Sequence, residues 1–109
     1  DGMAYRVPVI TGSVTDLTVK LTKGASLADV NEAYRQASMS DNFHHILGYS
    51  DEPLVSTDYI GNPNSCTIDS LATSAVGDDF VKVVGWYDNE WGYSSRTADL
   101  ANFMVEKGI

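Results

Sequence analysis

The sequence predicts an α+β domain, with a mostly antiparallel sheet and two amphipathic helices packed on one of its faces. Residues 13–21 alternate between apolar and polar side chains, as a half-buried strand does. Residues 26–37 and 93–104 carry apolar side chains at helical spacing, and several strand-like segments lie between them. Strands that cluster between two helices, instead of alternating with them, are typical of α+β domains.

The first strand and the first helix have clear sequence signals. The later odd-numbered positions of residues 13–21 are apolar and share one face, and the strand ends at Lys23. Ser26 is placed to cap the following helix, and Asp29 three residues on gives a near capping-box arrangement. The apolar stripe of this helix consists of Leu27, Val30, Ala33, Tyr34 and Ala37.

The middle of the chain is expected to hold short strands separated by turns. Residues 61–64 (Gly-Asn-Pro-Asn) form a strong turn signal, and residues 77–79 (Gly-Asp-Asp) are typical of a hairpin. Segments rich in β-branched and aromatic residues lie between such turns. The strands expected here are residues 46–49, 54–60, 65–69 and 73–76.

Residues 80–87 form the most hydrophobic of the predicted strands. Val81 and Val83 point to one face and Trp86 to the other, so we expect burial on both faces. A second amphipathic helix follows, and Gly108 occupies a position typical of a helix C-terminus. The stripe of this helix consists of Tyr93, Thr97, Leu100 and Met104.

Composition narrows the class of protein. The chain has 109 residues, which is enough for one domain, and its 43% hydrophobic and 20% charged content is that of a globular protein. A net charge of -8 without any basic cluster argues against nucleic acid as a partner. No apolar run has membrane-spanning length. The single cysteine excludes an internal disulfide, so a cytoplasmic location is the default expectation.

Few residues carry a chemical signal of their own. Cys66 lies in a predicted strand, where a buried and inert thiol is expected instead of a nucleophile. His44 and His45 are adjacent and lack further ligands at metal-binding spacing, so no metal site is predicted. Arg6 fits either a surface ion pair or an anion site, because a guanidinium pairs well with phosphate oxygens.

The polar residues before the second helix leave two interpretations open. The amide of Asn89 offers a donor and an acceptor, which suits a carboxamide ligand, but asparagine also favours helix capping. Asp88 is an alternative cap that would free Asn89. Tyr93 belongs to the helical stripe, so its spacing alone favours core packing over a place in a cleft.

Several collinear stretches together resemble one enzyme family. The run at residues 86–90, Trp-Tyr-Asp-Asn-Glu, is the most specific of them. With the other stretches, it makes the chain similar to the C-terminal part of the catalytic domain of phosphorylating glyceraldehyde-3-phosphate dehydrogenase, from residue 1 to residue 109. The stretches that carry the resemblance are residues 2–8, 13–18, 46–49, 55–59, 81–84 and 86–94.

The resemblance implies a reaction and roles for three residues. Enzymes of this family, which act in glycolysis, oxidise an aldehyde phosphate with a nicotinamide dinucleotide and inorganic phosphate, through a cysteine thiolate that attacks the aldehyde. By resemblance, Arg6 helps to hold the substrate phosphate, Asn89 pairs with the nicotinamide carboxamide, and Tyr93 lines the nicotinamide pocket. NAD and NADP both stay open as cofactors, because the residue that distinguishes them belongs to a Rossmann domain.

The chain also departs from the family pattern. It contains neither the Gly-rich Rossmann loop nor the Ser-Cys-Thr-Thr-Asn nucleophile motif, since Cys66 is followed by Thr-Ile-Asp, and neither His44 nor His45 matches the histidine that pairs with the nucleophile. We therefore expect no catalytic residue in this chain and no activity from the chain alone.

The family resemblance also predicts partners. We expect the remaining part of the enzyme to complete the site, and a homo-oligomer, a tetramer in the family, to form through an apolar sheet face turned away from the helices. Two alternatives stay open. The chain is either part of a sister enzyme that oxidises erythrose 4-phosphate, or a non-catalytic module that self-associates.

Overall fold

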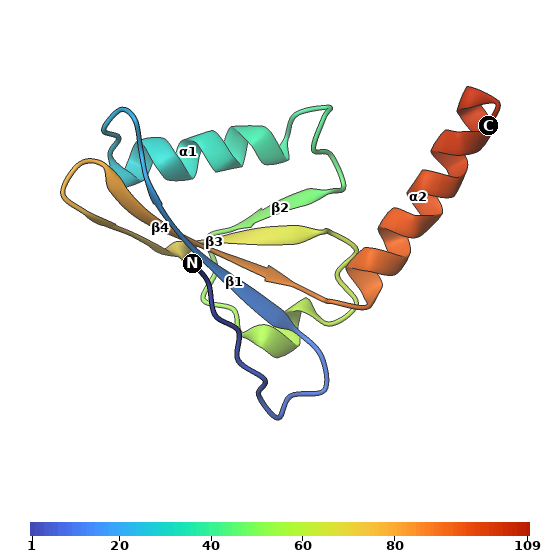
Figure 1. Ribbon diagram of the computed structural model, residues 1–109, viewed down its shortest axis with the longest axis horizontal. Coiled ribbons are helices and arrows are strands. Elements are labelled where there is room, and N and C mark those ends of the chain that lie inside the picture. Colours follow the sequence, from blue (N-terminus) through green and yellow to red (C-terminus); the bar gives the residue numbers. More distant parts are fainter.

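The computed structural model describes residues 1–109 and shows one four-stranded mixed sheet with two α-helices (Figure 1). The strand order is β1-β4-β3-β2; β4 is antiparallel to both of its neighbours, and only the β2–β3 pair is parallel. The predicted α+β class with a mostly antiparallel sheet is confirmed. In chain order the elements are β1 (Ser13–Lys20), α1 (Leu27–Ser38), β2 (Leu47–Ser50), the 3-10 helix η1 (Ser56–Tyr59), β3 (Cys66–Val76), β4 (Phe80–Tyr87) and α2 (Trp91–Lys107).

The strand predicted at residues 54–60 is wrong. This segment forms η1, because the carboxylate of Asp58 accepts a hydrogen bond from the backbone N–H of Val55 at 2.7 Å and closes a turn. The turn also carries Tyr59 inward, where its ring stacks on Trp86 with centroids 5.7 Å apart. Local hydrogen bonding and this stacking override the strand preference of the β-branched residues.

The two short strands predicted at residues 65–69 and 73–76 are parts of the single strand β3. The register with β4 shifts between Asp69 and Ser74. At the shift, the Asp69 carboxylate accepts hydrogen bonds from the backbone N–H groups of Leu71 and Ala72 at 3.1 and 3.2 Å. A side chain that replaces ladder partners in this way produces a bulge, and the sequence reads as two segments for that reason.

The core lies between α1 and the sheet. Its buried centre consists of Ile68, Val81 and Val83, and Val81 is only 1% exposed. The capping box predicted at the start of α1 is confirmed, since the Ser26 hydroxyl accepts from the Asp29 N–H and the Asp29 carboxylate accepts from the Ser26 N–H, each at 3.1 Å. A secure start and a facing sheet together hold α1 in place.

The prediction that both helices pack on one sheet face is wrong for α2. This helix projects away from the sheet (Figure 1), and Leu100 and Met104 of its apolar stripe are 58% and 41% exposed. The Cα radius of gyration is 15.5 Å, whereas a compact chain of this length has about 13 Å. The stripe finds no facing apolar surface within these residues, so the contacts at the first turns alone decide the direction of α2. At its other end, Gly108 adopts the predicted left-handed conformation, with φ 73°.

We expected the sheet face turned away from α1 to be apolar, but it is mixed. It carries an ion pair between Lys82 Nζ and Asp16 Oδ2 at 2.7 Å. The Trp86 side chain, which suggested a partner on this face, lies against Tyr59 of η1 and donates to Asp69 at 3.1 Å. The sequence of β4 carries apolar residues on both faces, but β1 and β3 place polar residues beside them on this face.

Candidate functional site

Two of the three predicted site residues, Asn89 and Tyr93, lie where β4 ends and α2 begins. The Asp88 carboxylate caps α2, because its Oδ1 accepts from the N–H groups of Glu90 and Trp91 at 3.0 and 2.9 Å. This contact decides between the two interpretations of Asn89: Asp88 is the cap, and the Asn89 amide takes no part in capping.

Asp88 also connects segments that are distant in sequence. Its Oδ2 accepts from the Gly61 N–H at 2.9 Å, and the Thr11 hydroxyl lies 3.3 Å from Oδ1. Although Asp88 is only 4% exposed, the hydrogen bonds from Trp91 and Gly61 lower its pKa below the ordinary value, and they outweigh the opposing effect of burial. The carboxylate is therefore held in its charged form.

The Asn89 amide is held at one end and open at the other. Its Oδ1 accepts, at 3.3 Å each, from the Thr11 hydroxyl just before β1 and from the Ser13 hydroxyl at the start of β1. The side-chain Nδ2 has no hydrogen-bond partner in the chain, and the residue is exposed. Two N–H donors therefore face solvent from a side chain whose direction is fixed.

Tyr93 lies in the first turn of α2, one turn after Asn89. The expectation of core packing from its helical spacing is wrong, because the residue is 76% exposed. Its backbone carbonyl accepts from the Thr97 hydroxyl at 3.0 Å, while its phenol has no hydrogen-bond partner. The place of this phenol in a nicotinamide pocket stays a prediction.

Arg6 lies in the exposed segment before β1 and makes no ion pair or side-chain hydrogen bond within the chain. No contact joins it directly to Asn89. The link between them is the chain itself, since Thr11 follows Arg6 in the same segment and contacts Asn89. The local alternative of a surface ion pair finds no partner here, and the phosphate role of Arg6 stays a prediction.

The other candidate residues offer no second site. Cys66 lies in β3 beside the core, and burial raises the pKa of its thiol, which disfavours the nucleophilic thiolate. The His44 and His45 rings are 3.8 Å apart at centroid. No group of three or more His, Cys, Asp or Glu side chains lies close enough to hold a metal ion. None of the helices is both long and apolar enough to span a bilayer.

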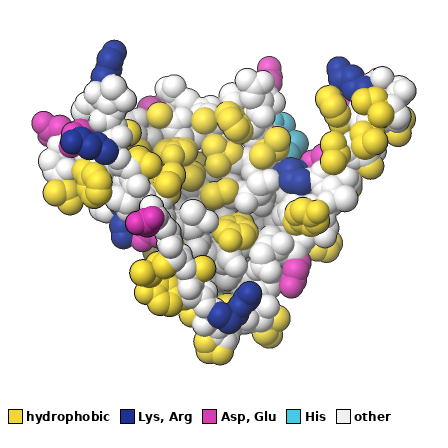
Figure 2. All heavy atoms as spheres, viewed as in Figure 1, with side chains coloured by type: hydrophobic (Ala, Val, Ile, Leu, Met, Phe, Trp, Pro, Cys, Tyr) yellow, Lys and Arg dark blue, Asp and Glu magenta, His cyan; other side chains and the backbone are white.

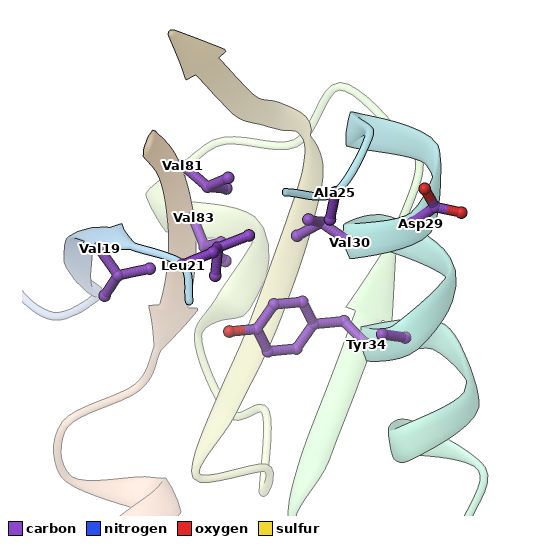
Figure 3. A pocket seen from close by; sticks show the side chains of 9 residues that line it. Val19, Leu21, Ala25, Asp29, Val30, Tyr34, Val81 and Val83 are labelled. Atoms are coloured by element: carbon purple, nitrogen blue, oxygen red, sulfur yellow. The ribbon is translucent and has the colours of Figure 1, made fainter. Parts of the chain in front are cut away.

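A separate apolar groove lies between α1 and the β1–β4 side of the sheet. Figure 2 shows apolar side chains gathered below α1 and along α2. The groove has a volume of about 260 Å³, and its single charged residue, Asp29, points away from it (Figure 3). Tyr34 reaches over from α1 toward Leu21. The groove contains none of the predicted site residues, and its lining can offer packing but little chemistry.

Sequence reasoning missed two anchoring groups. Arg96 of α2 donates to the backbone carbonyl of His45 at 2.8 Å and to that of Pro63 at 3.4 Å, so it ties the helix to two loops of the sheet. Thr11 contacts both Asp88 and Asn89. Neither long-range contact has a local sequence signal, whereas the capping role of Asp88 was visible as an alternative because it directly precedes a helical pattern.

The fold and this strand-end site define an α+β domain that presents an oriented amide beside a capped helix. Residues 1–89 match the family described as glyceraldehyde 3-phosphate dehydrogenase, C-terminal domain. The chain therefore belongs to the glyceraldehyde-3-phosphate dehydrogenase family, a family of oxidoreductases, and corresponds to its C-terminal domain.

Similar proteins come from bacteria and plants. The chain is 55% identical over 104 residues to glyceraldehyde-3-phosphate dehydrogenase 2 of Streptomyces arenae, covering 95% of this chain and 30% of that protein. It is 50% identical over 109 residues to glyceraldehyde-3-phosphate dehydrogenase of Priestia megaterium, covering 100% and 32%. It is 50% identical over 103 residues to the cytosolic glyceraldehyde-3-phosphate dehydrogenase 2 of Hordeum vulgare, covering 94% of this chain and 33% of that protein. The chain spans about a third of the length of these relatives.

Proposed function

We propose that this chain forms the C-terminal part of the catalytic domain of a phosphorylating glyceraldehyde-3-phosphate dehydrogenase. The complete enzyme oxidises an aldehyde phosphate with a nicotinamide dinucleotide and inorganic phosphate. The family match over residues 1–89 and the similarity to relatives that bear this name support the proposal. The same reaction on erythrose 4-phosphate is the closest alternative.

The observation that carries the proposal is that Asp88, and not Asn89, caps α2. Because Asp88 caps α2, the Asn89 amide is free for a ligand, and Thr11 holds its oxygen. In the proposed complex the Nδ2 donors meet the carboxamide oxygen of the nicotinamide and set which face of the ring turns to the substrate. Tyr93, exposed one turn along α2, lines the same pocket.

The residues present fit one end of the cofactor only. Asn89 matches the carboxamide, but the chain has no Gly-rich loop for the pyrophosphate, so the rest of the dinucleotide needs another part of the polypeptide. When bound, the nicotinamide dinucleotide accepts the hydride from the substrate. Arg6 contributes on the substrate side, where its free guanidinium pairs with phosphate oxygens.

We propose that the remaining part of the enzyme covers the apolar side of α2 and the groove beside α1, and that the chain alone is inactive. The chain exposes 7904 Å², whereas a compact monomer of 11.8 kDa exposes about 5,900 Å². The excess of roughly 2,000 Å² exceeds what one partner buries in a standard interface. The inert thiol of Cys66 offers no substitute for the family's nucleophile.

We also propose a homo-oligomer, a tetramer as in the family, formed through the sheet face turned away from α1, in a cytoplasmic enzyme. Exposed Val76 and Phe80 support it, at 74% and 46% exposure, while the Lys82–Asp16 pair gives this interface a mixed character. Self-association alone, without catalysis, is the alternative that the same exposed surface favours.

A chimeric enzyme tests the site assignments. The matching segment of the Priestia megaterium enzyme, to which all of this chain aligns, is replaced by this chain. Arg6→Ala should raise KM for glyceraldehyde 3-phosphate about tenfold and leave KM for NAD unchanged. Asn89→Ala should raise KM for NAD about tenfold and leave KM for glyceraldehyde 3-phosphate unchanged. Lys23→Ala and Asn102→Ala are the matched controls. Equal KM values in variant and control would refute the role of that residue, and a preference for erythrose 4-phosphate would favour the sister enzyme.

A further inference from the structure

Asp88 joins three segments that meet at the site. Its carboxylate accepts from Gly61 after η1 at 2.9 Å and from Trp91 at the start of α2 at 2.9 Å, and it lies 3.3 Å from the hydroxyl of Thr11 before β1. A buried carboxylate with this many donors has one well-defined position, because moving it would leave several N–H groups without partners.

The segment that carries Arg6 is fixed next to this carboxylate. Gly12 adopts φ 95°, and a Cβ there would lie 2.8 Å from the Ser56 carbonyl oxygen of η1. The chain therefore passes close against η1 at Gly12 while Thr11 contacts Asp88. Residues before this point are exposed and after it enter β1, so this contact decides where the segment leaves the sheet.

Thr11 links Asp88 to Asn89 through one hydroxyl. Its Oγ1 lies 3.3 Å from the Asp88 carboxylate and 3.3 Å from the Asn89 amide oxygen. The single proton of this hydroxyl is shared between the two acceptors, and the Ser13 hydroxyl also donates to Asn89, at 3.3 Å. The direction of the Asn89 amide thus depends on two hydroxyls whose positions follow from Asp88 and from β1.

We infer that Asp88 is a positioning residue for the cofactor site, acting through Asn89: it holds the start of α2, the loop at Gly61 and the Thr11 segment in one arrangement that aims the amide. The inference rests on the proposed function, since it assigns to Asp88 the orientation of a residue proposed to bind nicotinamide. It goes beyond that function by naming the group that joins the substrate-side and cofactor-side segments.

The test uses the full-length chimeric enzyme described above. Asp88→Asn keeps the volume of the side chain but removes the charge and one acceptor, so KM for NAD should rise about tenfold, with a smaller change in KM for the aldehyde phosphate. Thr11→Val keeps the shape and the α2 cap and should raise KM for NAD severalfold. This second variant keeps the test valid if Asp88→Asn folds poorly.

A double-mutant cycle separates positioning from a general effect on the fold. If Asp88 acts through Asn89, Asp88→Asn should change KM for NAD little once Asn89→Ala is present. Asp69→Asn is the matched control, because Asp69 also accepts from two backbone N–H groups and one side chain, but on the sheet at Trp86. It should lower the urea midpoint without changing KM for NAD.

The outcomes distinguish the two levels of the account. Normal KM for NAD in Asn89→Ala would overturn the nicotinamide assignment itself. An impaired Asn89→Ala enzyme with normal KM in both Asp88→Asn and Thr11→Val would overturn only the positioning role, and so would full additivity in the cycle. A rise in KM for NAD in Asp69→Asn equal to that in Asp88→Asn would do the same, since it would show a general loss of structure.

Discussion

The two helices have similar amphipathic patterns but opposite surroundings. Helix α1 lies against β2 and β3 and helps to bury Ile68, whereas α2 leaves the sheet after its first turns and exposes its apolar stripe. Each begins with a carboxylate that accepts from backbone N–H groups, Asp29 within α1 and Asp88 before α2. An amphipathic pattern therefore shows that a helix needs a facing surface, but not whether the same chain supplies it.

The largest difference between the regions should appear when apolar side chains are shortened. Val81→Ala removes buried methyl groups beneath α1 from a side chain that is 1% exposed, so the free energy of unfolding should fall by about 2 kcal/mol. Urea unfolding of the free chain, followed by circular dichroism, measures this. A loss within 0.5 kcal/mol, the usual limit for surface positions, would mean that the groove beside α1 collapses and that the core is looser than described.

Acid should weaken the start of α2 through Asp88. Its pKa is lowered in the folded chain by the N–H groups of Trp91 and Gly61, so its stabilising effect is complete above the unfolded value of about 3.9 and is lost as the pH falls through the lower folded value. Asp88→Ala should cost about 1 to 2 kcal/mol at neutral pH and much less in acid. A pH-independent cost would show that the charge of the carboxylate contributes nothing.

The cap of α1 should have a smaller effect. Ser26→Ala removes the hydroxyl that accepts from the Asp29 N–H, and unfolding free energy should fall by about 1 kcal/mol. The same variant should leave KM for NAD in the chimeric enzyme unchanged, because α1 contacts none of the proposed site residues. A rise in that KM would link α1 to the site and would weaken the contrast between the helices.

The smallest effect is expected on the exposed side of α2. Leu100→Ala in the free chain should change the free energy of unfolding by less than about 0.5 kcal/mol, because the side chain is 58% exposed. In the chimeric enzyme the same substitution should cost about 2 kcal/mol if the rest of the polypeptide covers this stripe. Equal small effects in both proteins would remove the support for a partner at α2.

Much of the fold was predictable because it follows from local rules. The strand β1, the capping box at Ser26 and the left-handed Gly108 were predicted from short windows, and all three are confirmed, although the burial along β1 does not alternate. The strand predicted at residues 54–60 was wrong because the turn closed by Asp58 and the stacking of Tyr59 on Trp86 override strand propensity. The mixed sheet face and the direction of α2 depend on neighbours distant in sequence, which no local pattern describes.

The sequence names candidate residues for the site but says little about their geometry. Resemblance supplied Arg6, Asn89 and Tyr93, and the spacing before α2 supplied Asp88 as an alternative cap. The contact of Thr11 with Asp88 and the bonds from Arg96 to two loop carbonyls join residues far apart in the chain. Such contacts exist only once the sheet is assembled, so only the structure reveals what holds the Asn89 amide in place.

The most direct test of the account compares NADH formation by the free chain and by the chimeric enzyme with glyceraldehyde 3-phosphate, NAD and phosphate. We propose that this chain contributes oriented binding groups but no nucleophile. We therefore predict no NADH from the free chain and turnover by the chimera within about tenfold of the Priestia megaterium enzyme. Turnover by the free chain, or a folded chimera that makes no NADH, would contradict it.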